Sequence, residues 1–93
     1  MLTLKQKVAV KQDILVQNVD GELVLLNLES EEYFGLDDVG SAMWSCLKES
    51  ESLQTAYDRL LDRYDVDSEQ LKQDFLNLVE RFVEHELVEI TQA

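Results

Sequence analysis

The stretch LVLLNLESEEYFGLDDVGSAMW, residues 23–44, decides how this chain folds. It predicts an apolar strand at Leu23–Leu28, an acidic turn, a short aromatic strand at Glu32–Leu36 and a helix that begins near Asp38. The first strand is apolar on both faces except at Asn27, as a central strand is, because a strand with one face in water alternates. The aromatic strand is then a sheet edge, whose unpaired backbone groups are a template for another chain. We therefore expect this edge to dock a peptide.

The residues before this stretch predict the rest of the sheet. Residues 8–19 hold two apolar clusters separated by a polar tripeptide and are strand-like. Asp20 and Gly21 follow, between two β-rich runs. This pair is typical of a tight hairpin turn, because glycine tolerates the positive φ that such a turn needs. The sequence therefore predicts three antiparallel strands in succession.

Three helices are predicted after the sheet, because the period of the apolar residues changes from two to near 3.6. Each has a short polar residue that can cap its first turn: Asp37 or Asp38, then Ser52 for a helix over 53–64, then Asp67 for a helix that runs to about residue 86. Gln70, three residues after the last cap, is placed to complete a capping box. The predicted fold class is α+β: a three-stranded antiparallel sheet followed by three helices, with a winged helix-turn-helix arrangement.

The third helix carries more apolar surface than one core-facing stripe requires. Its apolar residues form two lines: Leu71, Phe75, Leu78 and Phe82 in one, and Leu76, Val79, Val83 and Leu87 in the other. Two interpretations fit this pattern. Either the helix lies centrally between the other two helices, or one line meets the core and part of the other lines a groove beside the edge strand.

Length and charge limit the possible functions. A chain of 93 residues is expected to form one domain, residues 1–93. Its net charge of −12 repels phosphate backbones and anionic membranes, and the third helix carries two basic against five acidic residues. The N-terminus has no apolar signal-peptide core, and the single cysteine fits a reducing compartment. We therefore predict a cytoplasmic protein that binds neither nucleic acid nor membranes.

The sequence lacks patterns for catalysis or metal binding. It has no G-x-S-x-G, no glycine-rich phosphate loop and no H-E-x-x-H. We interpret His85, the only histidine, and Cys46 as structural, because their spacing supports no catalytic dyad. The acidic run at 65–69 opens like a calcium loop, but Gln70 and Leu76 stand where that loop needs Gly and Glu. No enzyme activity, metal or cofactor is expected.

Several short pieces of the sequence, taken in order, resemble the PqqD-like family. They are Asp20-Gly21, Leu25-Leu26-Asn27, Tyr33-Phe34-Gly35-Leu36-Asp37, Gly40, Trp44, Ser52-Leu53, Tyr64-Asp65-Val66, Asp74 and Leu87-Val88. The resemblance covers roughly residues 8–90 and is best for the discrete form found in lasso-peptide clusters. That form is a recognition element for ribosomally synthesised and post-translationally modified peptides (RiPPs). The chain departs from the family at Glu31 and Glu86, where Gly is common, so the backbone is expected to differ there.

The resemblance implies both a fold and a function. The fold has three strands and three helices. The function is non-catalytic binding of the leader segment of a precursor peptide, which is presented to a leader peptidase and possibly a cyclase. In the family the leader adds as a strand beside the third strand, in a cleft shared with the third helix. Carried over, the peptide-binding residues are Glu32, Tyr33, Phe34, Gly35, Leu36, Asp74, Phe75, Leu78, Arg81 and Phe82.

Two other functions stay open from the sequence. The first is a PqqD-type peptide chaperone of quinone-cofactor biosynthesis. The second is an acidic winged-helix adaptor, which would pair with another protein through the same strand edge and would need no leader.

Overall fold

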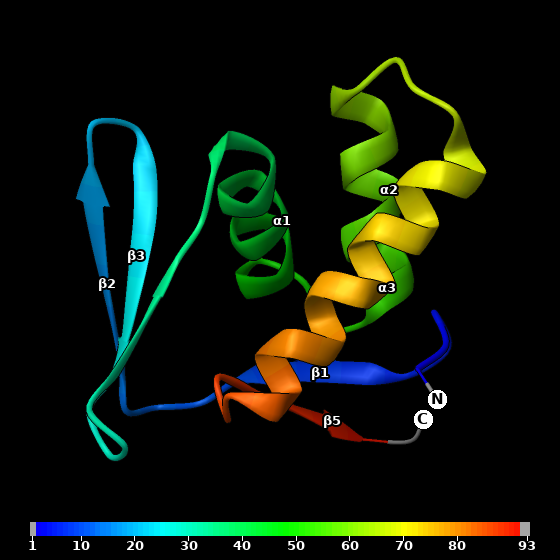
Figure 1. Ribbon diagram of the computed structural model, residues 1–93. Helices are drawn as coiled ribbons and strands as arrows, with labels where there is room; N and C mark the ends of the chain where they lie inside the picture. The colour runs from blue at the N-terminus through cyan, green and yellow to red at the C-terminus, as the bar shows by residue number, and fades with distance from the viewer. Residues whose placement is uncertain (1, 92–93) are drawn as a thin grey trace.

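The computed structural model describes residues 2–91. Within them the chain forms five strands and three helices (Figure 1). In chain order these are β1 (Lys7–Val10), β2 (Ile14–Val19), β3 (Glu22–Asn27), β4 (Glu32–Gly35), α1 (Asp38–Lys48), α2 (Leu53–Arg63), α3 (Ser68–Glu84) and β5 (Val88–Thr91). None of these helices has the length and apolarity that a membrane span requires.

The main sheet has the antiparallel order β2-β3-β4, with β3 in the centre as predicted. Leu25 of β3 lies opposite Val16 on one side and Phe34 on the other. The β2–β3 hairpin turns at Asp20 and Gly21, whose φ angles are 54° and 87°. This confirms the hairpin prediction, since a two-residue turn of this type needs positive φ at both positions.

The prediction for residues 8–19 is wrong in one respect: they form two strands that belong to different sheets. β1 leaves the main sheet and pairs with β5, with Val8 opposite Ile90. The backbone N–H of Lys11 donates to the carbonyl of Leu87, at the polar tripeptide that separates the two strands. Val8 of β1 is buried, so the strand that pairs with β5 also contributes a side chain to the core.

Each helix begins after the predicted cap. Asp37 accepts a hydrogen bond from the N–H of Gly40, Ser52 from that of Thr55 and Asp67 from that of Glu69. The capping box is not formed, because the Gln70 amide donates forward to the Asp74 carboxylate instead, at 3.0 Å. The α2 and α3 helices end one and two residues before the predicted ends.

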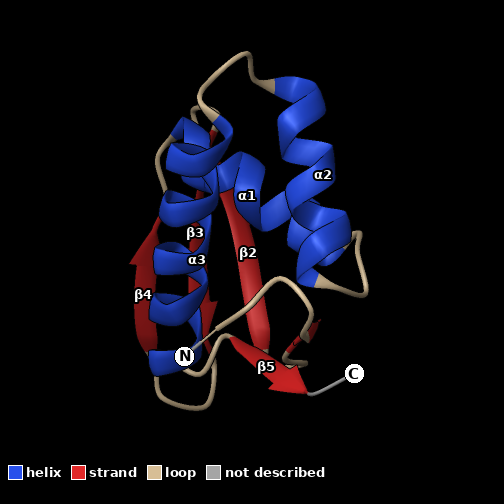
Figure 2. Ribbon diagram, turned by 90° about the vertical axis from the view of Figure 1, so that its right-hand side faces the viewer, coloured by secondary structure: helices blue, strands red, loops and turns tan. Residues whose placement is uncertain are grey.

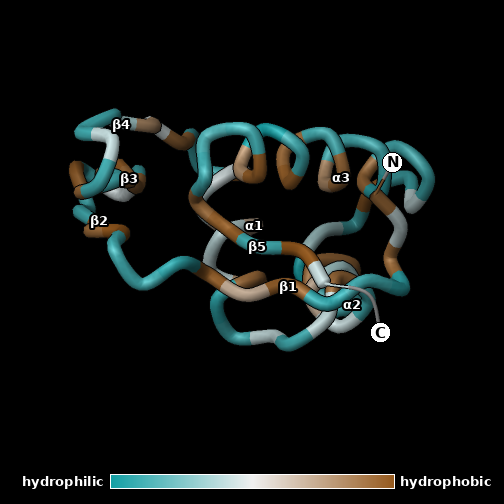
Figure 3. The backbone as a smooth tube through the Cα atoms, turned by 90° about the horizontal axis from the view of Figure 1, so that it is seen from below, coloured by the Kyte–Doolittle hydropathy of each residue, from teal (hydrophilic) through white to brown (hydrophobic). Residues whose placement is uncertain are grey.

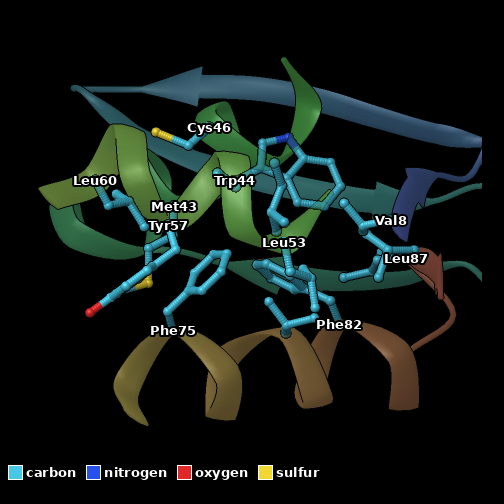
Figure 4. Packing of buried hydrophobic residues seen from close by; sticks show 14 of the residues in the cluster. Val8, Met43, Trp44, Cys46, Leu53, Tyr57, Leu60, Phe75, Phe82 and Leu87 are labelled. Carbon is cyan, nitrogen blue, oxygen red and sulfur yellow. The ribbon is translucent and has the colours of Figure 1, made fainter. Parts of the chain in front are cut away.

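One stripe of α3 faces the core, and it draws on both predicted apolar lines. Its buried residues are Leu71, Phe75, Val79 and Phe82. Figure 4 shows Phe75 and Phe82 pointing from α3 toward the core, where Phe82 meets Trp44 edge to face with ring centres 5.2 Å apart. Leu78 is only half-buried, at the border of this stripe. The second interpretation is wrong in its detail, because Leu78, the apolar α3 residue that lines the groove, belongs to the same line as Phe75 and Phe82. The winged helix-turn-helix label stays a prediction.

At both positions where glutamate stands in place of a common glycine, the backbone has the left-handed conformation that glycine favours. Glu31 and Glu86 have φ angles of 63° and 58°, in the left-handed region that favours glycine. Glu86 completes a Schellman motif, because its N–H donates to the Val83 carbonyl at 3.0 Å and the N–H of Leu87 donates to the Phe82 carbonyl at 2.8 Å. The fold therefore imposes these conformations on side chains that do not prefer them.

We predict that Glu31→Gly and Glu86→Gly each raise the free energy of unfolding by up to about 1 kcal/mol. Removing the side chain relieves strain in the left-handed conformation and stabilises the folded state by roughly 1–2 kcal/mol. Glycine also gives the unfolded chain more conformational freedom, which lowers the stability by about 0.4–1 kcal/mol. Urea denaturation followed by circular dichroism measures the change.

The matched control is Glu86→Gln, which removes the same charge and keeps the strained backbone. A gain as large for Glu86→Gln as for Glu86→Gly would assign the effect to charge and contradict the conformational explanation.

Candidate functional site

A groove of about 480 Å³ lies between β4 and α3, and the start of α1 closes one end of it. We call it the β4–α3 groove. Figures 2 and 3 show the two elements next to each other in two views. Eleven residues line the groove: Phe34, Gly35, Leu36, Asp37, Val39, Gly40, Met43, Asp74, Asn77, Leu78 and Arg81.

The side chain of Phe34 forms the floor of the groove. Its ring contacts Phe82 edge to face, with ring centres 5.6 Å apart, and it contacts the His85 ring at 5.1 Å. The guanidinium carbon of Arg81 lies 5.1 Å above the same ring, in a cation–π arrangement. The two walls are therefore joined through side chains, and the backbone of α3 need not approach that of β4.

The outer edge of β4 has no strand beside it within residues 2–91, because β4 pairs with β3 alone. Tyr33 is 70% exposed on the face of the sheet away from the core. A Cβ atom built on Gly35 would meet no atom within 4 Å, so the space beside this residue is open. Another main chain can therefore approach β4 closely at this point.

A buried amide fixes the end of the groove near the C-terminus of α3. The side chain of Asn27 is almost fully buried. Its Nδ2 donates to the carbonyls of His85 and Glu86, at 3.3 and 3.4 Å. Its Oδ1 accepts from the N–H groups of Glu29 and Ser30, at 2.9 and 3.2 Å. These four bonds, which we call the Asn27 bridge, join the β3–β4 turn to the end of α3.

The structure brings six of the ten predicted site residues into the groove: Phe34, Gly35, Leu36, Asp74, Leu78 and Arg81. Phe75 and Phe82 are fully buried in the core, so they support the groove from beneath and offer a guest no surface. Tyr33 and Glu32 are exposed on β4 and do not line the groove.

Sequence reasoning missed five lining residues and the Asn27 bridge. The five are Asp37, Val39, Gly40, Met43 and Asn77. Asp37 could have been included, because it directly follows the edge strand, and Asn77 because it lies one turn from both Asp74 and Arg81 on α3. Asn27 carried a signal as the one polar residue in an apolar central strand, but nothing in the sequence indicated its partners.

Cys46 and His85 are held in different surroundings. Cys46 is buried in the core on α1, and this burial raises the pKa of its thiol. His85 packs against Phe34 at one end of the groove. Among residues 2–91, no three His, Cys, Asp or Glu side chains gather closely enough to hold a metal ion.

Comparison with protein families gives one match. Residues 22–88, from β3 to the first residue of β5, match the family described as coenzyme PQQ synthesis protein D (PqqD). No curated protein sequence matches this chain.

Two solved structures share the fold. TbiB1, determined in complex with the TbiA(beta) leader peptide, is 32% identical with a TM-score of 0.78; the match covers 86% of this chain and 93% of TbiB1. A lasso peptide synthetase B1 complexed with the leader peptide is 24% identical with a TM-score of 0.76, and the match covers 88% of this chain and 96% of that one. At this lower identity the second comparison shows a common fold.

We predict that Asn27→Ala lowers the free energy of unfolding by roughly 2–4 kcal/mol, because it leaves buried carbonyl and N–H groups without partners. Chemical denaturation measures this. The control is Asn18→Ala, since the Asn18 side chain accepts a single exposed hydrogen bond, from Gly21, and its removal should cost about 1 kcal/mol or less. If the two variants lost equal free energy of unfolding, the Asn27 bridge would contribute no more to stability than the exposed hydrogen bond of Asn18.

The raised pKa of Cys46 predicts two further observations. At pH 8 the thiol of the folded protein should react with iodoacetamide at least about a hundredfold more slowly than that of the urea-unfolded chain, because the reactive thiolate is rare and buried.

Stability should also fall as the pH rises above the ordinary thiol value of 9.0, where the unfolded state loses its proton first. Cys46→Ala should weaken this decline. Rapid alkylation of the folded protein would contradict the assignment of Cys46 to the core.

Proposed function

Because this chain belongs to the PqqD family, we propose that it is a RiPP recognition element: it binds the leader segment of a ribosomally synthesised precursor peptide without catalysing a reaction on it. The observation that carries the proposal is the unpaired edge of β4 beside a groove that holds both apolar and charged side chains. Support comes from the likeness to TbiB1, which is 32% identical and whose structure contains a leader peptide.

In the proposed complex the leader adds to β4 as a fourth strand of the main sheet. Its backbone pairs with the free edge of Glu32–Gly35, and alternate side chains point into the groove. Those side chains would contact Phe34, Leu36 and Leu78, between the charged residues Asp74 and Arg81. Tyr33 would lie on the opposite face of the enlarged sheet, next to the outward side chains of the leader.

The energies support this mode. Micromolar binding requires about −8 kcal/mol. Four or five new backbone hydrogen bonds contribute about 1 kcal/mol each, which roughly offsets a cost of association of at least about 4 kcal/mol. The remainder must come from apolar leader side chains, at about 1.5–3 kcal/mol for each one buried. Three such side chains suffice, and the groove offers Phe34, Leu36, Met43 and Leu78 to receive them.

The proposal includes the partners that act next. A leader held on β4 would be delivered to a leader peptidase and a cyclase, as in lasso-peptide biosynthesis, the pathway of the second structural relative. We also propose that the protein is cytoplasmic and that its sheet and helices form a winged helix-turn-helix arrangement.

The family match favours one alternative. PqqD is named for coenzyme PQQ synthesis, so the guest could be the precursor of a quinone cofactor, held in the same groove by the same edge. The RiPP recognition element and the PqqD-type chaperone are distinguished by which precursor peptide binds. An adaptor without a leader would instead bind a folded partner through β4 and ignore either peptide.

Leu78→Asp should weaken binding of the leader by roughly 10- to 100-fold, because it replaces one apolar contact in the groove with a charge. The probe is the leader of the precursor encoded in the same gene cluster, measured by titration calorimetry. The matched control is Leu76→Asp, the same change on the opposite flank of α3, outside the groove. The proposal fails if the unmodified protein gives no binding heat, or if Leu76→Asp weakens binding as much as Leu78→Asp.

A further inference from the structure

The β4–α3 groove carries opposite charges at its two ends. Arg81 lies over the ring of Phe34, at the beginning of the groove as β4 runs. Asp37 follows β4 at the other end, where Asp74 lies beside the first turns of α1. Asp74 and Arg81 are seven residues apart on α3, which corresponds to about 10.5 Å along the helix.

None of these three charges is neutralised by a neighbour. The ion pairs within residues 2–91 are Lys11–Glu89 and Arg59–Glu49, and neither involves the groove. Asp37 accepts a hydrogen bond from a backbone N–H and Asp74 accepts one from the Gln70 amide, and neither of these donors carries a charge. In a chain of net charge −12, Arg81 is a cation left available to a guest.

The two walls of the groove run in opposite directions. A strand bound between them therefore passes the charges in an order that depends on its direction. β4 runs from Phe34, beside Arg81, toward Leu36 and Asp37, whereas α3 runs from Asp74 toward Arg81 (Figure 2). Both strand pairs of the main sheet are antiparallel, and a guest that continues this pattern beside β4 passes the acidic end first and Arg81 last. At about 3.4 Å per residue, 10.5 Å spans three residues, and side chains on one face recur every two.

Building on the proposed function, we infer that the leader carries a basic side chain followed, two or four residues later, by an acidic one. The basic side chain pairs with Asp37 and Asp74 and the acidic one with Arg81, so that these three residues determine the direction and register of the bound strand.

Backbone pairing alone cannot determine the direction and register of the bound strand. Main-chain hydrogen bonds tolerate both strand directions and a slip of two residues, because neither change moves a side chain to the other face. Reversal of the guest brings like charges together at both ends of the groove. A slip of two residues moves each charge by about 7 Å and separates both pairs. The charges therefore contribute discrimination against wrong arrangements more than they contribute affinity.

The expected effect is moderate because the groove is open to water. Single exposed ion pairs contribute little, but exchanging the two charges of a guest turns two attractions into two repulsions. We expect this exchange to weaken binding by roughly tenfold at low salt. The difference should shrink to about twofold at 1 M salt, where the screening length is about 3 Å.

The test selects peptides from a randomised ten-residue library displayed on yeast, using the full chain as the target. It compares the unmodified protein with two charge-balanced variants that keep the net charge at −12. The first, Asp74→Lys/Arg81→Glu, inverts the two α3 charges of the groove. The control, Glu80→Lys/Lys72→Glu, makes the same exchange on the other flank of α3, outside the groove. Fluorescence anisotropy then gives the Kd of each selected peptide and of its charge-exchanged isomer.

The unmodified protein and the control should select peptides in which the basic residue precedes the acidic one. The inverted variant keeps Asp37, which offsets the new lysine at that end of the groove, so its selected peptides should lose this order and favour a basic residue at the later position. Selected peptides without a charge order for the unmodified protein, or with the same order for the inverted variant, would overturn the inference and leave the proposed function intact.

Failure of the proposed function gives a different result. In that case no selected peptide loses affinity for Leu78→Asp, and the inference falls with it. Arg81→Gln provides a second measurement if the inverted variant does not fold, and it should reduce the preference between isomers about threefold.

Discussion

The structure depends on the four hydrogen bonds of Asn27. The last carbonyls of a helix have no partners within it, and the left-handed turn at Glu86 satisfies those of Phe82 and Val83 only. Asn27 donates to two carbonyls just beyond the last helical residue, on His85 and Glu86, and so ties the end of α3 to the turn before β4. Because the amide belongs to β3, the central strand, it holds α3 beside the sheet edge without covering that edge.

An open edge strand makes a protein prone to aggregation, because copies of the chain can pair there. β4 is only four residues long, and acidic residues surround it: Glu29, Glu31, Glu32, Asp37 and Asp38. A second copy would bring the same charges and be repelled, whereas a peptide with basic residues would be attracted. The strong negative charge of the chain therefore favours a foreign guest over self-association.

Local chemistry predicted the elements that depend on neighbouring residues. The Asp20-Gly21 hairpin, the caps at Asp37, Ser52 and Asp67, and the edge position of β4 were each visible in a short window of sequence. Two features escaped because they join distant parts of the chain.

The first of these is the pairing of β1 with β5, which brings the two ends of the fold together. The second is the Asn27 bridge, whose donors and acceptors lie up to 59 residues apart. Periodicity also could not decide which residues of α3 face inward, because both lines are apolar and the buried stripe takes Phe75 and Phe82 from one line and Val79 from the other.

The geometry of α3 separates the residues that the fold needs from those that the proposed guest would contact. Phe75, Val79 and Phe82 face the core, and the groove residues Asp74, Leu78 and Arg81 precede each of them by one position. Neighbouring residues on a helix point about 100° apart, so each groove side chain can change while the core side chain after it stays in place.

The floor and the supports of the groove do not have this freedom. Phe34 contacts both walls and Asn27 fixes the end of the groove, so substitution of either would disturb the sheet itself. If the groove binds a peptide as proposed, its specificity can therefore change through a few exposed positions of α3 while the rest of the fold stays the same. This is consistent with a fold that is retained at 24–32% identity among the proteins that share it.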